Sequence, residues 1–152
     1  MAKPSKQPKL ISNRKARFDY NLKDTLIVGI QLSGAETKAI RQGHAQLRGS
    51  YVNILKGELW LINANISGTN AAPIDEADQY RTRKLLAKSS EINDLSKAKD
   101  QGLTIVPLEL LTNGKYIKLK IAVGQGKKNY DKRESLKKRD EERKIQRFKY
   151  SG

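Results

Sequence analysis

The sequence predicts a mainly β protein with a few added helices, followed by a charged C-terminal tail. Three observations support this prediction. Apolar residues alternate with other residues, with a period of two, in separate segments between positions 19 and 123. Turn signals that contain glycine separate several of these segments, as expected for an antiparallel sheet. From residue 126 onward, in contrast, no continuous apolar stripe forms on a helical wheel.

The first half of the chain is predicted to contain a strand, a helix and a hairpin. The strand is residues 19–32, where the apolar side chains at positions 26, 28, 30 and 32 alternate with their neighbours. A short helix is predicted over residues 35–42, with Ser33 as its N-cap and Gly43 as its stop. Two strand-like runs, 50–55 and 58–66, are then joined at Lys56-Gly57 into a hairpin.

The second half begins with residues 67–77, whose Gly, Thr, Asn, Ala and Pro content indicates a mobile loop. A helical stretch is predicted over residues 82–95, because Leu85, Ile92 and Leu95 recur at helical spacing. Ser89-Ser90 marks a point where this stretch could divide into two helices. We expect Trp60 and Tyr51 to be packing residues within their strands.

A second hairpin is the clearest element of the sequence. Residues 103–111 are apolar and rich in β-forming residues, and Asn113-Gly114 is a strong tight-turn signal. In the returning strand, positions 117, 119, 121 and 123 are apolar and alternate with Lys118 and Lys120. One face of this strand is therefore predicted to pack inward while the other presents lysines to solvent.

Five or six strands with two hairpins and few helices predict a small antiparallel OB-like Greek-key barrel with short flanking helices. We place this barrel at residues 11–125, after a disordered basic N-terminus at residues 1–10. Residues 126–152 form a basic tail, expected to be disordered when free. The i,i+4 pairs Glu134–Lys138 and Asp140–Lys144 make the tail competent to become helical when a partner holds it.

The charge balance predicts a polyanionic partner. The chain has 31 Lys and Arg against 16 Asp and Glu, a formal net charge of +15. Residues 1–17 contain six cations and no acid, and residues 126–152 contain eleven cations and five acids. Nucleic acid and an anionic membrane both fit this excess. The membrane is disfavoured because no apolar run approaches 18 residues, and the absence of cysteine suits a cytoplasmic location.

No constellation for catalysis is recognisable. His44 is the single histidine, the acids are scattered, and residues 124–128 lack the spacing of a phosphate-binding P-loop. Without cysteine, a thiolate zinc site is excluded. We therefore expect no enzyme activity, metal, cofactor or small-molecule substrate.

Two segments have residues suited to RNA contact. Three cations lie in residues 81–84, at the predicted N-terminus of the middle helix, where free N–H groups can bind a phosphate. Residues 126–133 combine two lysines, the Tyr130 ring and a Lys-Arg pair, which suits phosphate contact and base stacking. A solvated helix end and a solvated linker are the alternatives for these two segments.

Several sequence blocks, in order and with their spacing, resemble the SmpB family of tmRNA-binding (SsrA-binding) proteins. They are NRKARFDY at residues 13–20, GAETK at 34–38 with RQG at 41–43, RTRKLL at 81–86, GLTIVPL at 102–108 and GKKNYDKR at 126–133. The resemblance implies an OB-like barrel with added helices that binds the tRNA-like domain of tmRNA.

The same resemblance implies a role in ribosome rescue by trans-translation. Alanyl-tmRNA would be delivered to the A site of a stalled ribosome, with the tail helical in the decoding centre and empty mRNA channel. The alternative is a ribosomal or tRNA-binding OB-type module with no rescue role.

The candidate contact residues follow from the resemblance and the charge pattern. Those assigned to tmRNA are Asn13, Arg14, Lys15, Arg17, Glu36, Lys38, Arg41, Arg81, Arg83, Lys84 and Leu86. Those assigned to the decoding centre and the mRNA channel are Gly126, Lys127, Lys128, Tyr130, Asp131, Lys132, Arg133, Lys137, Lys138, Arg139 and Arg143.

The sequence departs from the family pattern in several places, one of which is Ala87, where the block at residues 81–86 would continue with a third leucine. An acidic residue tied to tmRNA binding usually occupies the position of Ile27, so we expect Ile27 to belong to an apolar strand face or a rearranged contact. The segment before Arg81 has an acidic patch, Asp75-Glu76-Ala77-Asp78, in place of the family's Asn-His pair. These departures predict a tmRNA that has co-adapted with the protein.

Overall fold

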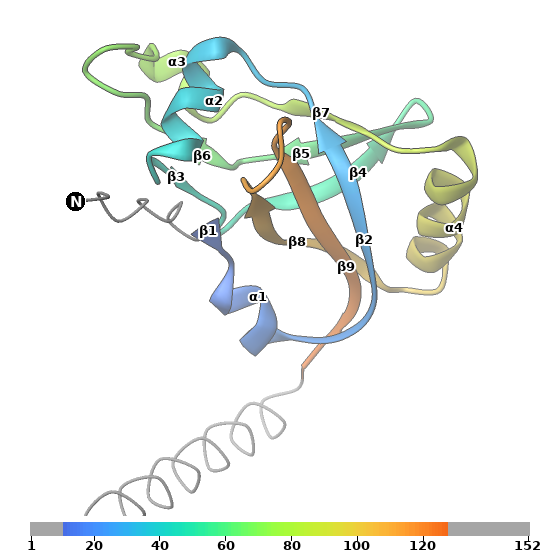
Figure 1. Cartoon of the computed structure of the whole chain (residues 1–152). Coiled ribbons are helices and arrows are strands. Elements are labelled where there is room, and N and C mark those ends of the chain that lie inside the picture. The colour runs from blue at the N-terminus through green and yellow to red at the C-terminus, as the bar shows by residue number, and fades with distance from the viewer. Residues whose placement is uncertain (1–10, 128–152) are drawn as a thin grey trace, which may run out of the picture.

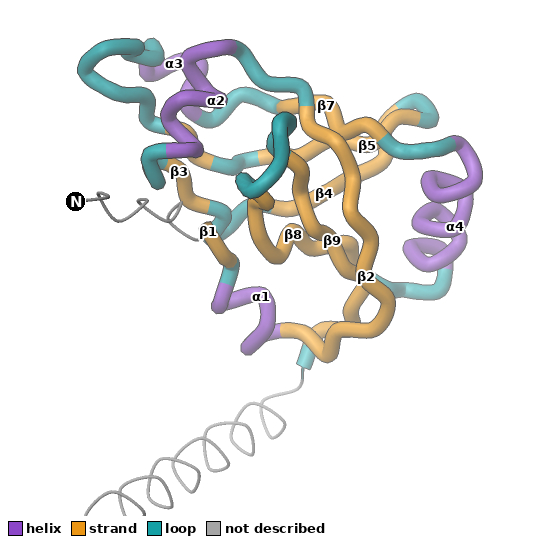
Figure 2. Tube along the Cα trace, in the orientation of Figure 1, coloured by secondary structure: helices purple, strands orange, loops and turns teal. Residues whose placement is uncertain are grey.

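A seven-stranded antiparallel sheet forms the body of the protein in the computed structural model, which describes residues 11–127 (Figures 1 and 2). The elements, in chain order, are β1 (Ile11–Ser12), α1 (Arg14–Asp19), β2 (Tyr20–Ile30), α2 (Gly34–Arg41), β3 (Ala45–Gln46), β4 (Tyr51–Leu55), β5 (Glu58–Ile62), β6 (Asn65–Ile66), α3 (Glu76–Gln79), β7 (Arg83–Leu86), α4 (Ser89–Asp100), β8 (Thr104–Leu111) and β9 (Lys118–Gly126). The strand order is β1-β8-β9-β2-β7-β5-β4, and β3 pairs with β6 separately.

The sheet curls around an apolar core, so that β4 approaches β8 and the barrel has a seam there (Figure 2). Strand β9 shows how the sequence specifies the core, because Leu119 and Ile121 are fully buried and Lys118 is exposed. Ala39 and Ile40 of α2 and Leu95 of α4 join the core cluster, so these two helices cover its open sides. The predicted fold class, a mainly β OB-like barrel with short flanking helices, is confirmed.

Local sequence signals place two elements as predicted. In α2, the Ser33 hydroxyl accepts a hydrogen bond from the Glu36 N–H at 3.2 Å, and the Ser33 N–H donates to the Glu36 carboxylate at 2.8 Å. This reciprocal capping box fixes the start of the helix. In the β4–β5 hairpin, Lys56 and Gly57 have φ angles of 52° and 75°. Two consecutive positive φ angles are the signature of the tight I′ turn that matches strand twist.

The helix predicted over residues 82–95 is wrong in its first part. Residues Arg83–Leu86 form strand β7, which pairs with β2 and β5, and α4 begins only at Ser89. Burial alternates along β7, with Arg83 and Leu85 inside and Leu86 exposed. A buried arginine conceals this period of two, because a charged residue is read as a solvent-facing position. The predicted phosphate site at a helix N-terminus is therefore absent from this segment.

The connection between β8 and β9 also differs from the prediction. Residues 112–117 form a longer loop in place of a two-residue turn at Asn113-Gly114. The Arg41 guanidinium holds this loop by donating hydrogen bonds to the carbonyl oxygens of Thr112, Gly114 and Lys115 at 3.0, 3.1 and 2.9 Å. A contact from α2, distant in sequence, thus overrides a strong local turn signal.

Three smaller differences concern element boundaries. The strand predicted over residues 58–66 ends at Ile62, because Asn63 takes a φ of 66°, and β6 follows in the smaller sheet. Helix α1 was not predicted, and its N-cap is Asn13, whose side chain accepts from the Ala16 N–H at 3.2 Å. The short helix α3 includes Glu76, which falls in the predicted loop. Across residues 11–127, no helix is long and apolar enough to cross a membrane.

Candidate nucleic-acid interface

The structure separates the predicted RNA-contact residues between the two ends of β2. Helix α1, which contains Arg14, Lys15 and Arg17, joins β2 at Tyr20, whereas β7 pairs with β2 at Gly29 and Ile30 (Figure 1). Strand β2 has 11 residues, and an extended chain of that length spans about 30 Å. The two groups therefore belong to different surfaces, although the sequence suggests a single one.

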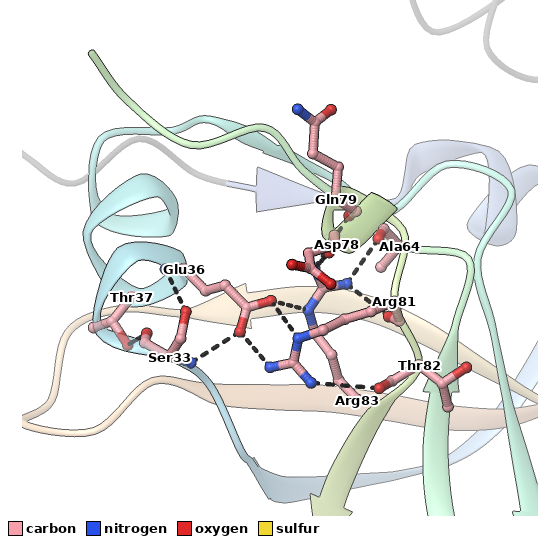
Figure 3. A network of polar contacts seen from close by, with 9 residues as sticks. All are labelled: Ser33, Glu36, Thr37, Ala64, Asp78, Gln79, Arg81, Thr82 and Arg83. Carbon is pink, nitrogen blue, oxygen red and sulfur yellow. Dashed lines mark hydrogen bonds and ion pairs between the residues drawn. The ribbon is translucent and has the colours of Figure 1, made fainter. Parts of the chain in front are cut away.

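Glu36 is the centre of a network of polar contacts at the β7 end (Figure 3). Its carboxylate accepts hydrogen bonds from the guanidinium of Arg81, including one from Nε at 3.1 Å, and from Arg83 Nε at 2.6 Å. Arg83 also donates to four backbone carbonyl oxygens, those of Ala64, Asp78, Gln79 and Arg81, at 2.9 to 3.2 Å. The network ties α2, β7, α3 and the segment before β6 together.

Burial sets the electrostatics of this network. Arg83 is 0% exposed and Glu36 is 2% exposed. Burial acts to raise the pKa of Glu36, but hydrogen bonds from Arg81, the Ser33 N–H and Arg83 outweigh it and hold that pKa below its usual value. Burial lowers the pKa of Arg83, and the Glu36 carboxylate opposes this effect. Glu36 and Arg83 therefore form an internal ion pair.

Four of the predicted contact residues make contacts within the protein that stabilise the fold. Glu36 and Arg83 are buried and cannot meet a phosphate in this conformation, which corrects their assignment as direct contacts. Arg41 holds the 112–117 loop. Asn13, 4% exposed, donates to the carbonyl oxygens of Pro107 and Leu47 at 3.1 and 3.4 Å, which fixes α1 to β8. Arg81 keeps 37% of its side chain exposed.

An exposed surface with both lysines and apolar side chains lies on the outer side of the sheet. We call it the outer face, and its residues are Ile27, Trp60, Lys84, Leu86, Lys118 and Lys120. Strand register brings them together, because Ile27 is opposite Lys120, Gly29 is opposite both Lys118 and Leu86, and Trp60 is opposite Lys84. Paired residues of an antiparallel sheet point to the same side.

Exposure makes the outer face suitable for contact with a ligand. Ile27 is 53% exposed and Leu86 is 48% exposed, which is unusual for large apolar side chains in strands. The missing side chain of Gly29 lets Leu86 pack over the β2 backbone, since a Cβ atom there would lie 3.1 Å from the Leu86 Cβ. Two acids border the face, with Glu58 3.1 Å from Lys84 Nζ and Glu109 3.8 Å from Lys120 Nζ.

Sequence reasoning placed Lys84 and Leu86 in the site but omitted Lys118, Lys120 and Trp60. The alternation of lysines in the β9 sequence was the available signal for the first two. The expectation that Ile27 belongs to an apolar strand face or a rearranged contact stays a prediction, because Ile27 is 53% exposed and lies opposite Lys120 on a face of mixed character.

The other predicted residues are distributed as follows. Lys38 on α2 is exposed and borders a shallow pocket with His44 and Gly68. Gly126 ends β9, and the Lys127 N–H donates to the Asp19 carbonyl oxygen at 2.8 Å. The Lys127 ammonium is 6.0 Å from the centre of the Phe18 ring. The remaining predicted tail contacts lie outside the described residues: Lys128, Tyr130, Asp131, Lys132, Arg133, Lys137, Lys138, Arg139 and Arg143.

Comparison with known proteins agrees with these features. An SsrA-binding protein of Gloeobacter violaceus is 45% identical over 139 residues, which are 91% of each chain. Another, from Trichormus variabilis, is 46% identical over 150 residues, which are 97% of each chain. A solved structure described as "tmRNA-SmpB: a journey to the center of the bacterial ribosome" contains a similar chain, with a TM-score of 0.65. It is 36% identical to this chain, and the match covers 79% of this chain and 85% of that one.

The sequence profile of the SmpB protein family matches residues 10–151, which include both the barrel and the tail. With relatives of this identity along nearly the whole length, the chain belongs to the SmpB protein family.

Proposed function

We propose that this protein binds the tRNA-like domain of tmRNA through the outer face and delivers alanyl-tmRNA to stalled ribosomes for trans-translation. The observation that carries the proposal is that lysines and apolar side chains share one strand surface, on which Lys118, Ile27 and Leu86 are exposed. Lysines neutralise phosphates, while Ile27, Leu86 and Trp60 offer apolar area to bases or riboses. Family membership supports tmRNA as the RNA, since the relatives are named for binding SsrA.

The second part of the proposal concerns the tail. Residues 126–152 enter the decoding centre and mRNA channel, become helical there, and are disordered in the free protein. The start of the tail supports separate sites for tmRNA and for the ribosome. Gly126 leaves the barrel beside Asp19 and Tyr20, at the opposite end of β2 from β7. The protein acts as a cytoplasmic RNA-binding adaptor without catalysis of its own.

Removing two lysines of the outer face tests the tmRNA site. Lys118→Ala combined with Lys120→Ala is expected to weaken binding of a tRNA-like tmRNA fragment at least several-fold. The slope of log affinity against log salt should decrease by about 0.7–0.9 for each phosphate that is no longer neutralised. Fluorescence anisotropy over a salt series measures both quantities. Lys23→Ala combined with Lys97→Ala, two exposed lysines off this face, is the charge-matched control. Equal weakening in the two variants would contradict the assignment.

Ile27→Glu tests co-adaptation of the outer face with its RNA. Since Ile27 is 53% exposed, the melting temperature should stay near that of the unchanged protein. The new carboxylate would lie opposite Lys120 and repel phosphates, so affinity for the protein's own tmRNA should fall or stay level. Tighter binding with unchanged stability would refute co-adaptation. Ile27→Gln separates the effect of charge from that of lost apolar area.

A further inference from the structure

The Asn113-Gly114 pair does not form the tight turn that its sequence predicts. Asn113 is the only one of the nine asparagines that a glycine follows. A type I′ turn at this pair would need positive φ angles at both residues, and neither residue has one. Both lie in the longer 112–117 loop, whose end residues Thr112 and Ile117 are buried. The distinctive property that remains to this pair is its chemical reactivity.

An asparagine that precedes glycine can react with its own backbone. The Gly114 nitrogen would attack the Asn113 Cγ carbon, a C–N bond would close a succinimide ring, and the side-chain nitrogen would leave as ammonia with the proton of the attacking N–H. Glycine favours this step because it has no Cβ atom to hinder the approach. Water then opens the ring at either carbonyl carbon and gives aspartate or isoaspartate. The net change replaces NH2 by OH, and it needs no oxidant, reductant or cofactor.

Both reacting groups are accessible in the structure. Asn113 and Gly114 are exposed, as are the two residues that follow them. Among residues 11–127, no partner forms a hydrogen bond with the Asn113 side chain or with the Gly114 N–H. The electrophilic carbon and the attacking nitrogen are therefore held by nothing but the backbone of the loop.

Arg41 holds the loop without engaging the reacting atoms. Its hydrogen bonds go to the carbonyl oxygens of Thr112, Gly114 and Lys115. The succinimide ring is built instead from the Asn113 side chain, the Asn113 backbone carbonyl group and the Gly114 nitrogen. Isoaspartate would insert an additional CH2 group into the backbone between the Thr112 and Gly114 carbonyl groups. Arg41 could then no longer hold all three oxygens in their present positions.

The modified residue would lie at the border of the outer face. Lys118 directly follows the loop and pairs with Gly29, which also lies opposite Leu86. Deamidation replaces a neutral side chain by a carboxylate, which lowers the positive potential that attracts phosphates to this border. Release of the loop from Arg41 would also change the position of the exposed Lys115. Both effects weaken contact with RNA.

We propose that Asn113-Gly114 is a site of spontaneous deamidation, which converts the 112–117 loop of the ageing protein into a negatively charged form that binds tmRNA more weakly. The chemical step is a property of the loop itself and does not depend on RNA. The weakening of tmRNA binding rests on the proposed function, because it assumes that the outer face is the tmRNA surface.

Peptide mass spectrometry of the full chain, aged in warm neutral buffer, tests the chemical step. Asn113 should deamidate at least several-fold faster than Asn70, which is exposed in another loop but precedes alanine. Gly114→Ala should slow the reaction several-fold and still fold, since its Cβ atom would meet only the Tyr116 carbonyl oxygen, at 3.7 Å. Equal rates at Asn113 and Asn70, or an unchanged rate in Gly114→Ala, would overturn the assignment of the site.

Fluorescence anisotropy with the tRNA-like tmRNA fragment tests the consequence. Aged protein should bind several-fold more weakly than fresh protein, whereas Gly114→Ala protein aged in parallel should keep its affinity. Asn113→Asp, which adds the charge without the additional CH2 group, should show a smaller decrease than the aged protein. Full affinity in protein whose Asn113 has been converted would overturn the effect on binding. If fresh protein does not bind the fragment, the proposed function fails, while the mass measurement still decides the site.

Discussion

Arg83→Met is expected to lower the free energy of unfolding by about 3–5 kcal/mol, because it breaks a buried ion pair. Arg83 is fully buried, and its guanidinium bonds Glu36 and four backbone carbonyl oxygens. Methionine fills much of the same space but cannot donate to the four carbonyl oxygens, and it leaves Glu36 with only the donors of Arg81 and Ser33. Urea denaturation followed by circular dichroism measures the change.

The exposed pair Lys84 and Glu58 supplies the matched control. These side chains are 35% and 47% exposed, and their charged atoms are 3.1 Å apart. Lys84→Met should change stability by no more than about 1 kcal/mol, because water already solvates both charges. An Arg83→Met protein as stable as the Lys84→Met protein would show that the network does not hold the barrel together.

The depressed pKa of Glu36 adds a pH dependence with a definite sign. The folded state favours the ionised carboxylate, so the stabilisation is complete above the usual carboxyl pKa of about 4.3. It is lost as the pH falls from there through the lower pKa of the folded protein. Glu36→Gln should therefore reduce stability most at neutral pH, and its difference from the unchanged protein should shrink in acid.

Tyr130→Ala is expected to reduce peptide transfer to alanyl-tmRNA on stalled ribosomes while leaving tmRNA affinity intact. Stacking on a base contributes roughly 1–3 kcal/mol, which corresponds to about a fivefold to 150-fold reduction in transfer. Deleting residues 126–152 should abolish transfer more completely. A reconstituted translation assay on a message without a stop codon measures it, with tmRNA binding and melting temperature measured on the same samples.

Tyr116→Ala is the control for this prediction. Tyr116 is 72% exposed in the loop between β8 and β9, so its replacement removes an exposed tyrosine from another place. If Tyr130→Ala lowers the melting temperature and leaves rescue unaffected at a permissive temperature, Tyr130 anchors the tail on the barrel. The decoding-centre role would then be wrong.

Regular patterns determined the parts of the structure that the sequence predicts well. The alternation in residues 117–123 predicted the buried side of β9. Ser33 and Glu36 specified the start of α2, and Lys56-Gly57 specified the first hairpin turn, because each signal acts within a few residues. The ordered sequence blocks likewise indicated the SmpB family, since their order and spacing can be read without knowledge of the fold.

Tertiary structure alone decided which charged residues are free to bind RNA. Arg83 and Glu36 are 47 positions apart in the sequence and meet inside the protein, and Arg41 meets a loop 71 positions away. From composition, Arg83, Glu36 and Arg41 are all expected at the surface, and no signal in the neighbouring sequence identifies their partners. Register also decided the outer face, by placing Ile27 beside Lys120 and Leu86 beside Gly29. Local signals fix where strands lie in the sequence, whereas long-range pairing fixes which side chains share a surface.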